Sequence, residues 1–323
     1  MKYFYISILI LGMSSLAISQ QEQQYTQFMF NKLGINPAYA GTQDMTCITG
    51  VYRNQWIGFE GAPKTQLLSF NSPLGTDRIG LGVNAIRHTI GITKSVNVDL
   101  AYAYRFKLSA KSRLSLGLQG ALRYYGRDYS DPRLVATQGL FTDGSIPYGV
   151  QNKYVPNFGL GVYFQSPGFY MGISAPRLIS NNIDFSTFGT DIGKEQPHVF
   201  GMVGVTIGLG KNLKLQPQIL TKITKNSPID FDGNVMLLIK DRYYVGATYR
   251  YGGSTAVGIG ESIDVLLGAE IIKNLLFGFS YDITLSEIKD YTSGSIEAVI
   301  RYCIPTKAKS DVKTEEYINP RFF

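Results

Sequence analysis

The stretch that decides the fold of this chain is Val96-Asn97-Val98-Asp99-Leu100-Ala101-Tyr102-Ala103-Tyr104-Arg105-Phe106. Every even-numbered residue in it is apolar or aromatic, whereas the odd-numbered residues are small or polar and include Asp99 and Arg105. Successive side chains of a β-strand point to opposite faces, so this period of two predicts a strand with one apolar and one polar face.

The same alternation continues along most of the chain. It predicts strands near 46–56, 64–72, 77–88, 93–107, 112–126, 154–165, 168–178, 197–209, 212–224, 228–239, 242–251, 254–271, 274–285 and 294–304. Tight turns alternate with longer connections, notably 127–153, 179–196 and 286–293. Short turns at one end and longer loops at the other are typical of bacterial outer-membrane barrels. The sequence therefore predicts an all-β, antiparallel transmembrane barrel of about 14 strands over 46–304, with both termini periplasmic.

Composition excludes the main alternatives to a barrel. The 323 residues are 44% hydrophobic and only 17% charged, the reverse of the balance in disordered chains, and two cysteines are too few for a disulfide-built miniprotein. Soluble domains carry about 25% charged residues. Beyond the N-terminus no apolar run approaches the roughly 18 residues of a spanning helix. Strands in which apolar and polar residues alternate give a high overall fraction of hydrophobic residues without any long apolar run.

The first residues have the three-part form of a secretory signal peptide over 1–19. Lys2 precedes an apolar centre, Ile6 to Leu11, and Ala17 and Ser19 are the small residues before cleavage. The alternative is a membrane anchor, for which the apolar stretch is short. We expect export, followed by a periplasmic or plug segment over 20–45 and, after the barrel, a periplasmic tail over 305–323.

Charged residues of both signs fall on the inward face of the predicted strands. They are Arg53, Asp99, Arg105, Arg123, Arg250, Glu270, Asp282, Glu297 and Arg301. Mixed signs favour a paired network that closes the lumen over a single-sign lining for ion selection, and a water-exposed lumen is the alternative. Strand glycines on the same face would leave room inside. We therefore expect a lumen filled by side chains, with the N-terminal segment as a candidate contributor.

The two cysteines, Cys47 and Cys303, lie in the first and last predicted strands, which become neighbours when a barrel closes. The periplasm is oxidising, so a disulfide across this seam can form if the Cα atoms come within about 7 Å. Two separate buried thiols are the alternative, and the sequence alone favours them.

Enzymatic chemistry has little support. The chain has two histidines, His88 and His198, and it has no metal-ligand spacing, nucleophile elbow or phosphate loop. We expect no catalytic residues, no cofactor and no metal. The net charge of +7 comes without a basic cluster interleaved with aromatics, so nucleic acid is not an expected partner. Outer-loop cations at Arg127, Arg133 and Lys153 either meet anionic lipopolysaccharide or are simply solvated.

Four motifs in order carry a family resemblance. They are Asn36-Pro37-Ala38-Tyr39-Ala40-Gly41, Tyr52-Arg53-Asn54-Gln55-Trp56, Tyr281-Asp282 and the terminal Pro320-Arg321-Phe322-Phe323. Together they resemble the PorP/SprF family, membrane proteins of the Bacteroidota type IX secretion system.

The resemblance implies a monomeric outer-membrane barrel that helps to secrete particular cargo, often large adhesins, or holds it at the cell surface. Its implied partners are the cargo or its C-terminal domain, periplasmic secretion components, and outer-membrane lipid. Cargo contacts are expected on 127–153 and 179–196, and the terminal tail is either an assembly signal or a periplasmic docking segment. The alternative function is a passive barrel that admits an apolar or nutrient solute.

Overall fold

The computed structural model describes residues 22–75, 78–134, 147, 149–183, 185, 193–225, 227–252 and 260–305. The strands are β1 (Met45–Asn54), β2 (Lys64–Pro73), β3 (Ile79–Ile90), β4 (Thr93–Lys107), β5 (Arg113–Asp128), β6 (Val150–Ser166), β7 (Phe169–Ala175), β8 (His198–Val205), β9 (Ile207–Gly208), β10 (Leu213–Thr224), β11 (Asp230–Ile239), β12 (Tyr243–Tyr251), β13 (Ser262–Ile272), β14 (Leu275–Thr284) and β15 (Ser295–Pro305). Short 3-10 helices are η1 (Phe28–Phe30), η2 (Lys32–Gly34), η3 (Pro37–Tyr39) and η4 (Glu287–Tyr291). No helix among these residues is long and apolar enough to cross a membrane.

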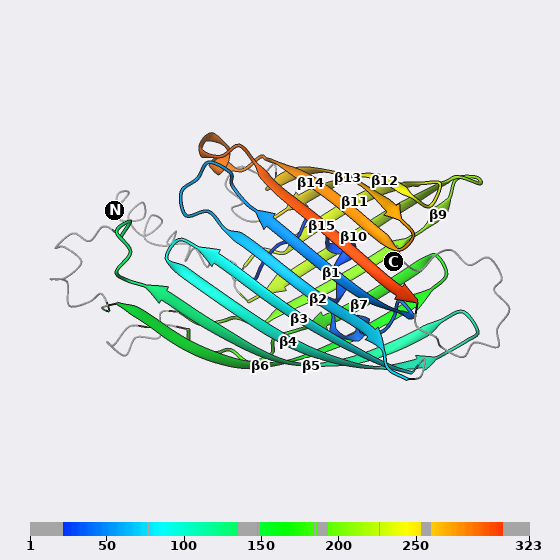
Figure 1. Ribbon diagram of the computed structural model, residues 1–323, viewed down its shortest axis with the longest axis horizontal. Coiled ribbons are helices and arrows are strands. Elements are labelled where there is room, and N and C mark those ends of the chain that lie inside the picture. The colour runs from blue at the N-terminus through cyan, green and yellow to red at the C-terminus, as the bar shows by residue number, and fades with distance from the viewer. Residues whose placement is uncertain are drawn as a thin grey trace, which may run out of the picture.

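The strands form one closed antiparallel barrel (Figure 1). Each strand pairs with its neighbours in the chain, and β15 pairs with β1 to close the circle. β8 and β9 both pair with β10 and count as one interrupted wall strand, so the barrel has 14 strands, which confirms the predicted fold. The interruption at Thr206 lies beside Pro217 of β10, which has no N–H to donate across the ladder.

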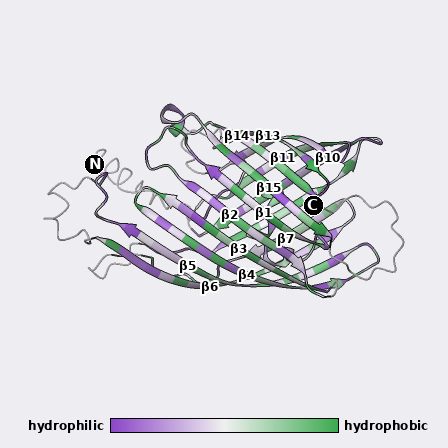
Figure 2. Cartoon of the chain, viewed as in Figure 1, coloured by the Kyte–Doolittle hydropathy of each residue, from purple (hydrophilic) through white to green (hydrophobic). Residues whose placement is uncertain are grey.

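The alternation places apolar side chains outside and polar ones inside. In β4, Val98 and Leu100 are exposed on the outer surface, whereas Asp99 and Arg105 are almost fully buried in the lumen. Green and purple bands alternate along the strands for the same reason (Figure 2). The outer surface is therefore apolar and suited to lipid, and the inner surface is polar and must be paired.

The connections divide the barrel into two ends. The turn end carries the tight connections, such as residues 108–112 and 240–242, and the loop end carries the longer ones. Residues 22–44, here called the lumen segment, run inside the barrel from the loop end to the turn end, where the chain enters β1 (Figure 1). Glu22 and Pro305 therefore lie at opposite ends, whereas the two ends of the barrel wall, Met45 and Pro305, are register partners at the turn end. The periplasmic placement of both termini stays a prediction. The termini themselves and the predicted signal peptide lie outside the described residues.

The barrel closes at a seam between β1 and β15. Cys47 and Cys303 are register partners there, their Cα atoms are 4.1 Å apart, and a disulfide bond joins them. Both are buried, and the bridge links positions 256 residues apart in sequence.

We predict that intact protein has a mass about two hydrogens below that of the reduced chain. Replacing both cysteines by serine should lower stability by about 2–4 kcal/mol, because a cross-link over a long chain segment restricts the unfolded state. Mass spectrometry without reductant and thermal unfolding in detergent check the two statements. Free thiols at both positions in protein from the outer membrane would contradict the bridge.

Candidate functional site

Glycines on the inner face of the wall form the seat of the lumen segment. A Cβ on Gly117 of β5 would lie 2.2 Å from the Ala38 nitrogen, and one on Gly161 of β6 would lie 2.1 Å from Asn36 Oδ1. A Cβ on Gly80 of β3 would come within 2.0 Å of the Ala40 carbonyl oxygen. Because any side chain at these positions would overlap the segment, the glycines permit a backbone-to-wall contact that no other residue allows.

Asn36 fixes the segment to the wall on this seat. Its Oδ1 accepts a hydrogen bond from the Ala38 N–H (2.9 Å) and caps η3, which begins at Pro37. Its Nδ2 donates to the Val162 carbonyl of β6 (3.0 Å). An Asn-Pro pair therefore joins a local turn to a strand of the barrel, which gives the Asn36-Pro37 motif a structural role.

Aromatic rings surround the only lysine of the lumen segment. Lys32 is fully buried, and its Nζ lies 3.5 Å from the ring centroid of Tyr170 and 5.8 Å from that of Tyr39. Tyr39 also meets Tyr163 edge to face at 5.3 Å. The segment is thus held by packing against aromatic walls as well as by hydrogen bonds.

A cluster of charges beside the seam holds the segment near the loop end. Arg53 of β1 bonds to Asp282 of β14 (2.7 Å) and to Glu297 of β15 (3.3 Å), and all three side chains are buried. Glu297 accepts the backbone N–H groups of Thr26 (2.9 Å) and Gln27 (2.8 Å). This seam cluster joins three wall strands to the lumen segment in one network of charge-assisted hydrogen bonds.

Arg250 of β12 extends the seam cluster along the wall. Its Nε lies 2.9 Å from Asp232 of β11, and its other nitrogens lie 3.7 Å from Asp264 and 3.8 Å from Asp282. Strand alternation predicts that Arg53, Arg250, Asp282 and Glu297 face the lumen. In the structure these four side chains form one cluster there.

A second cluster lies at the loop end around Glu22. Arg123 of β5 lies 3.2 Å from Glu22 and 2.7 Å from Glu195, and Arg177 bonds to Glu22 and lies 3.7 Å from Asp99. Arg177 and Glu195 belong to the connection between β7 and β8 rather than to a strand. The inner part of this connection therefore folds over the lumen and covers the start of the segment.

The turn end has its own ion pairs. Arg105 of β4 and Arg113 of β5 lie 2.8 Å and 2.7 Å from Asp44, and Arg105 also donates to the carbonyl of Gly41. Gly41 has φ +72°, and a Cβ there would lie 2.6 Å from the Gly80 Cα. Only glycine meets both conditions, which explains the Gly41 position of the motif.

Two residues of the predicted interior set lie apart from these clusters. The Glu270 carboxylate accepts the backbone N–H of Asn274 (2.6 Å) in the turn between β13 and β14. The register shifts only after Glu270, between it and Ile272, so Glu270 keeps the inward parity of β13 and pairs with the buried Leu276 at the turn end. Arg301 is buried in the lumen, with its guanidinium 5.5 Å from the ring centroid of Phe30.

Three other motif residues lie near the loop end. Gln55 and Trp56 follow β1, where Trp56 has φ +49° and its N–H donates to the Ser295 hydroxyl (3.1 Å). Tyr281 is exposed on the outer wall, and its hydroxyl donates to the Ser293 carbonyl. Pro320 and Arg321 lie outside the described residues.

Each histidine has an ordinary polar partner. His88 Nδ1 lies 2.8 Å from the Thr65 hydroxyl, and His198 Nδ1 donates to the Gln196 carbonyl (2.9 Å). These contacts orient neither ring toward a serine or an aspartate, as a hydrolase would require.

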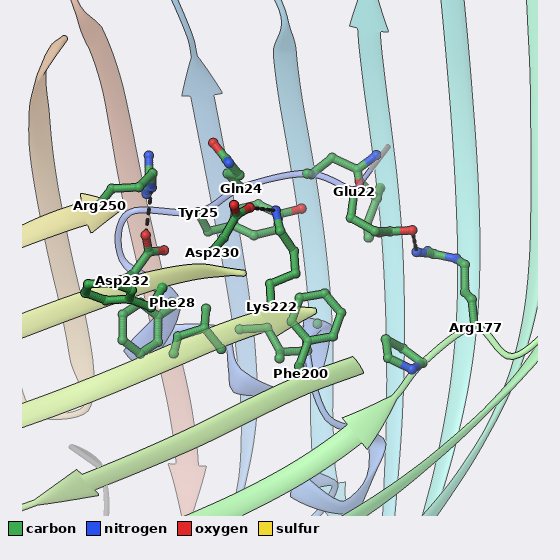
Figure 3. Close-up of a pocket in the computed structure, with 17 residues that line it drawn as sticks. Glu22, Gln24, Tyr25, Phe28, Arg177, Phe200, Lys222, Asp230, Asp232 and Arg250 are labelled. Atoms are coloured by element: carbon green, nitrogen blue, oxygen red, sulfur yellow. Dashed lines mark hydrogen bonds and ion pairs between the residues drawn. The ribbon is translucent and has the colours of Figure 1, made fainter. Parts of the chain in front are cut away.

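A cavity lies beside the lumen segment. It has a volume of about 40 Å³ and lies between the lumen segment and the wall, where it is lined by Phe28, Phe200, Lys222, Asp230 and Arg250 among others (Figure 3). This volume suits about three water molecules. Lys222 and Asp230 pair across it at 3.4 Å.

Ion pairing gives the loop-end cluster a pH dependence. Burial alone would raise the pKa of Glu22, but the charges of Arg177 and Arg123 outweigh it and hold the pKa well below the usual range. A depressed folded-state pKa stabilises the fold fully above the unfolded-state value of about 4.3, and this stabilisation is lost as the pH falls toward the folded-state value.

We therefore predict that Glu22→Gln destabilises the protein by about 1.5–3 kcal/mol near pH 7, the usual contribution of hydrogen bonds to charged groups. The difference from the wild type should be smaller near pH 3, because the wild type has then lost part of the same stabilisation. Thermal unfolding of both proteins at the two pH values measures this difference in stability. Glu60→Gln, at an exposed loop position, is the matched control, and an equal difference at both pH values would contradict the assignment.

Comparisons with known proteins agree with this architecture. A model of the family described as "Type IX secretion system membrane protein PorP/SprF" matches residues 17–302. A comparison with curated protein sequences finds no match.

Solved structures with a similar fold are outer-membrane barrels. The toluene transporter TbuX of Ralstonia pickettii has a TM-score of 0.50 at 10% identity, with 83% of this chain and 92% of that chain covered. The outer membrane protein Omp33 of Acinetobacter baumannii has a TM-score of 0.46 at 8% identity, with 80% and 98% covered. Identities this low show the fold alone. With the family match, the barrel fold establishes that the chain resides in the outer membrane.

Proposed function

The chain belongs to the PorP/SprF family of type IX secretion system membrane proteins, and from this premise we propose that it assists the secretion or surface retention of specific cargo such as adhesins. It acts by binding and not by catalysis. The relevant energies are then interface energies, contributed by buried anchor residues and a polar rim.

The observation that carries this proposal is the filled lumen. The lumen segment is tied at the loop end through Glu22, along the seam through Glu297, and at the turn end through Asp44. A barrel blocked along its length offers no pore for a folded or unfolded chain. Its binding surfaces are therefore the two rims of the barrel, with cargo bound at the loop end and periplasmic secretion components bound at the turn end.

The cargo surface that we propose consists of 127–153 and 179–196, most of which lies outside the described residues. The described bases of both loops are closed by backbone hydrogen bonds, from Tyr129 N–H to the Gly149 carbonyl (3.0 Å) and from Ile183 N–H to the Gly193 carbonyl (2.9 Å). Rigid bases allow either loop to be shortened without disturbing the barrel.

The closed bases permit a sharp test. In a strain lacking the gene, the wild type is compared with variants in which 130–148 or 184–192 is replaced by Asn-Gly, a two-residue hairpin turn. Residues Arg177 and Glu195 remain, so the loop-end cluster is preserved. The cell-surface proteome should lose particular cargo in the loop variants, while barrel abundance in the outer membrane is unchanged.

The control replaces Tyr291, an exposed residue of the connection between β14 and β15, by serine. A full set of surface proteins in both loop variants, or loss of a solute-uptake phenotype instead, would favour the passive-barrel alternative.

A further inference from the structure

Three neighbouring turns at the turn end carry a row of cations. These turns connect β9 to β10, β11 to β12 and β13 to β14, and their exposed cations are Lys211, Lys240, Arg242 and Lys273. We call these four residues the basic arc. The arc lies at the end of the barrel where β15 finishes, at the right of Figure 1.

Backbone hydrogen bonds join the three turns into one surface. The Lys240 N–H donates to the Asn212 carbonyl (2.7 Å), and the Glu270 N–H donates to the Arg242 carbonyl (2.8 Å). The Arg242 guanidinium donates to the carbonyls of Glu270 (3.1 Å) and Ile271 (3.2 Å), so it is held against the next hairpin. The backbones of the three turns, and with them the Cα positions of the four arc cations, are therefore held in a fixed arrangement.

Two carboxylates lie near the arc, and both are engaged. Asp241 bonds to Lys214 at 2.6 Å, and Glu270 accepts the Asn274 N–H. The local charge thus stays positive, and the arc attracts anions.

Large apolar side chains stand beside every turn of the arc. Leu209, Tyr243 and Ile272 are 50%, 46% and 61% exposed on the outer surface, and each lies within two residues of an arc cation. Arg242 also lies over the Tyr243 ring, 5.3 Å from its centroid. Cations directly beside exposed apolar and tyrosine side chains are typical of the headgroup depth of a membrane, where one end of the pair meets lipid tails and the other meets phosphate.

We infer that the basic arc binds the headgroups of anionic phospholipids in the leaflet at the turn end. Phosphate oxygens accept hydrogen bonds from ammonium and guanidinium groups, and the neighbouring Leu209, Tyr243 and Ile272 contact the acyl chains. The inference concerns lipid, so its test is independent of the secretion role proposed above.

The test uses the full protein in phosphatidylcholine vesicles with trace spin-labelled phosphatidylglycerol or phosphatidylcholine. Electron paramagnetic resonance then gives the relative association of the two lipids with the protein. The test variant is Lys211→Gln/Lys240→Asn/Lys273→Gln. Asparagine suits position 240 because the backbone there has φ +53°. The control, Lys64→Gln/Lys94→Gln/Lys225→Gln, removes three exposed cations at the loop end.

We expect the wild type and the control to prefer phosphatidylglycerol, and the arc variant to lose the preference by roughly threefold. A cation near an anionic surface contributes roughly a fivefold factor, which averaging over all contacting lipids reduces. Inorganic phosphate should weaken the preference no more than chloride of equal ionic strength, since the arc recognises a headgroup held at the membrane.

Four results would overturn the inference. The first three are a wild type without preference, equal losses in the arc variant and the control, and specific competition by free phosphate. A preference fully retained in the arc variant would also overturn it, and would leave an acidic protein as the class of partner. The heat-dependent mobility of each variant on electrophoresis shows separately that the barrel has folded.

Discussion

Valine at both Gly117 and Gly161 is expected to expel the lumen segment and open the barrel. Each new side chain would occupy space now held by Asn36 and Ala38, at 2.1–2.2 Å from the nearest atoms. Those atoms are backbone at Gly117, and at Gly161 they are the Asn36 amide, which is hydrogen-bonded to the Val162 carbonyl, and the Pro37 ring. Overpacking of this kind costs about 1–3 kcal/mol per site, and here the whole contact of η3 with the wall is lost. Valine itself suits a strand, so the wall should still form.

Two measurements report the expulsion. Trypsin should cleave after Lys32, which is fully buried in the wild type. In planar bilayers the variant should show channel conductance, and the wild type should show none. The control is the pair Gly120→Val/Gly233→Val, where an added Cβ meets nothing within 4 Å. A protease-resistant Lys32 in the test variant would show that the segment does not depend on its glycine seat.

Arg53→Ala is expected to lower stability by about 3–5 kcal/mol, the usual cost of removing one partner from a buried ion pair. The change leaves Asp282 and Glu297 with less compensating charge in a lumen from which water is largely excluded. Arg53→Lys should cost less, because it keeps the charge but loses the two-sided guanidinium contact.

Thermal unfolding in detergent compares these variants with Arg87→Ala, which removes an exposed arginine that donates a 3.4 Å hydrogen bond to Gln66. The control should change stability by less than about 0.5 kcal/mol. If Arg53→Ala behaved like the control, the seam cluster would contribute no net stability.

The period of two made the barrel predictable. Parity alone placed Arg53 and Glu297 on the inner face, and in the structure they are register partners across the seam. It also identified Cys47 and Cys303 as neighbours, because a closed sheet must pair its first and last strands.

Strand alternation makes no prediction for the ion-pair partners that lie outside strands. Glu22 and Asp44 belong to the lumen segment and Glu195 belongs to a loop, so no alternation assigns them a side. Arg177 falls within the predicted strand 168–178, but β7 ends at Ala175, so Arg177 lies in the connection that follows it. An acidic residue at each end of 20–45, facing a surplus of interior arginines, was the available signal. Glu270 keeps its inward parity because the bulge of β13 begins after it, but alternation alone does not show that it lies at the turn end, apart from the interior clusters.

Glu297 also has a consequence for the order of assembly. It lies in the last strand to leave the ribosome, yet it receives the N–H groups of Thr26 and Gln27 from the start of the described chain, beside the strand pair that closes the wall. Closing the wall and docking the segment thus complete the same network. A chain whose segment is misplaced would close around a Glu297 carboxylate that keeps Arg53 but lacks both backbone N–H donors, so a correctly filled interior favours the closing step.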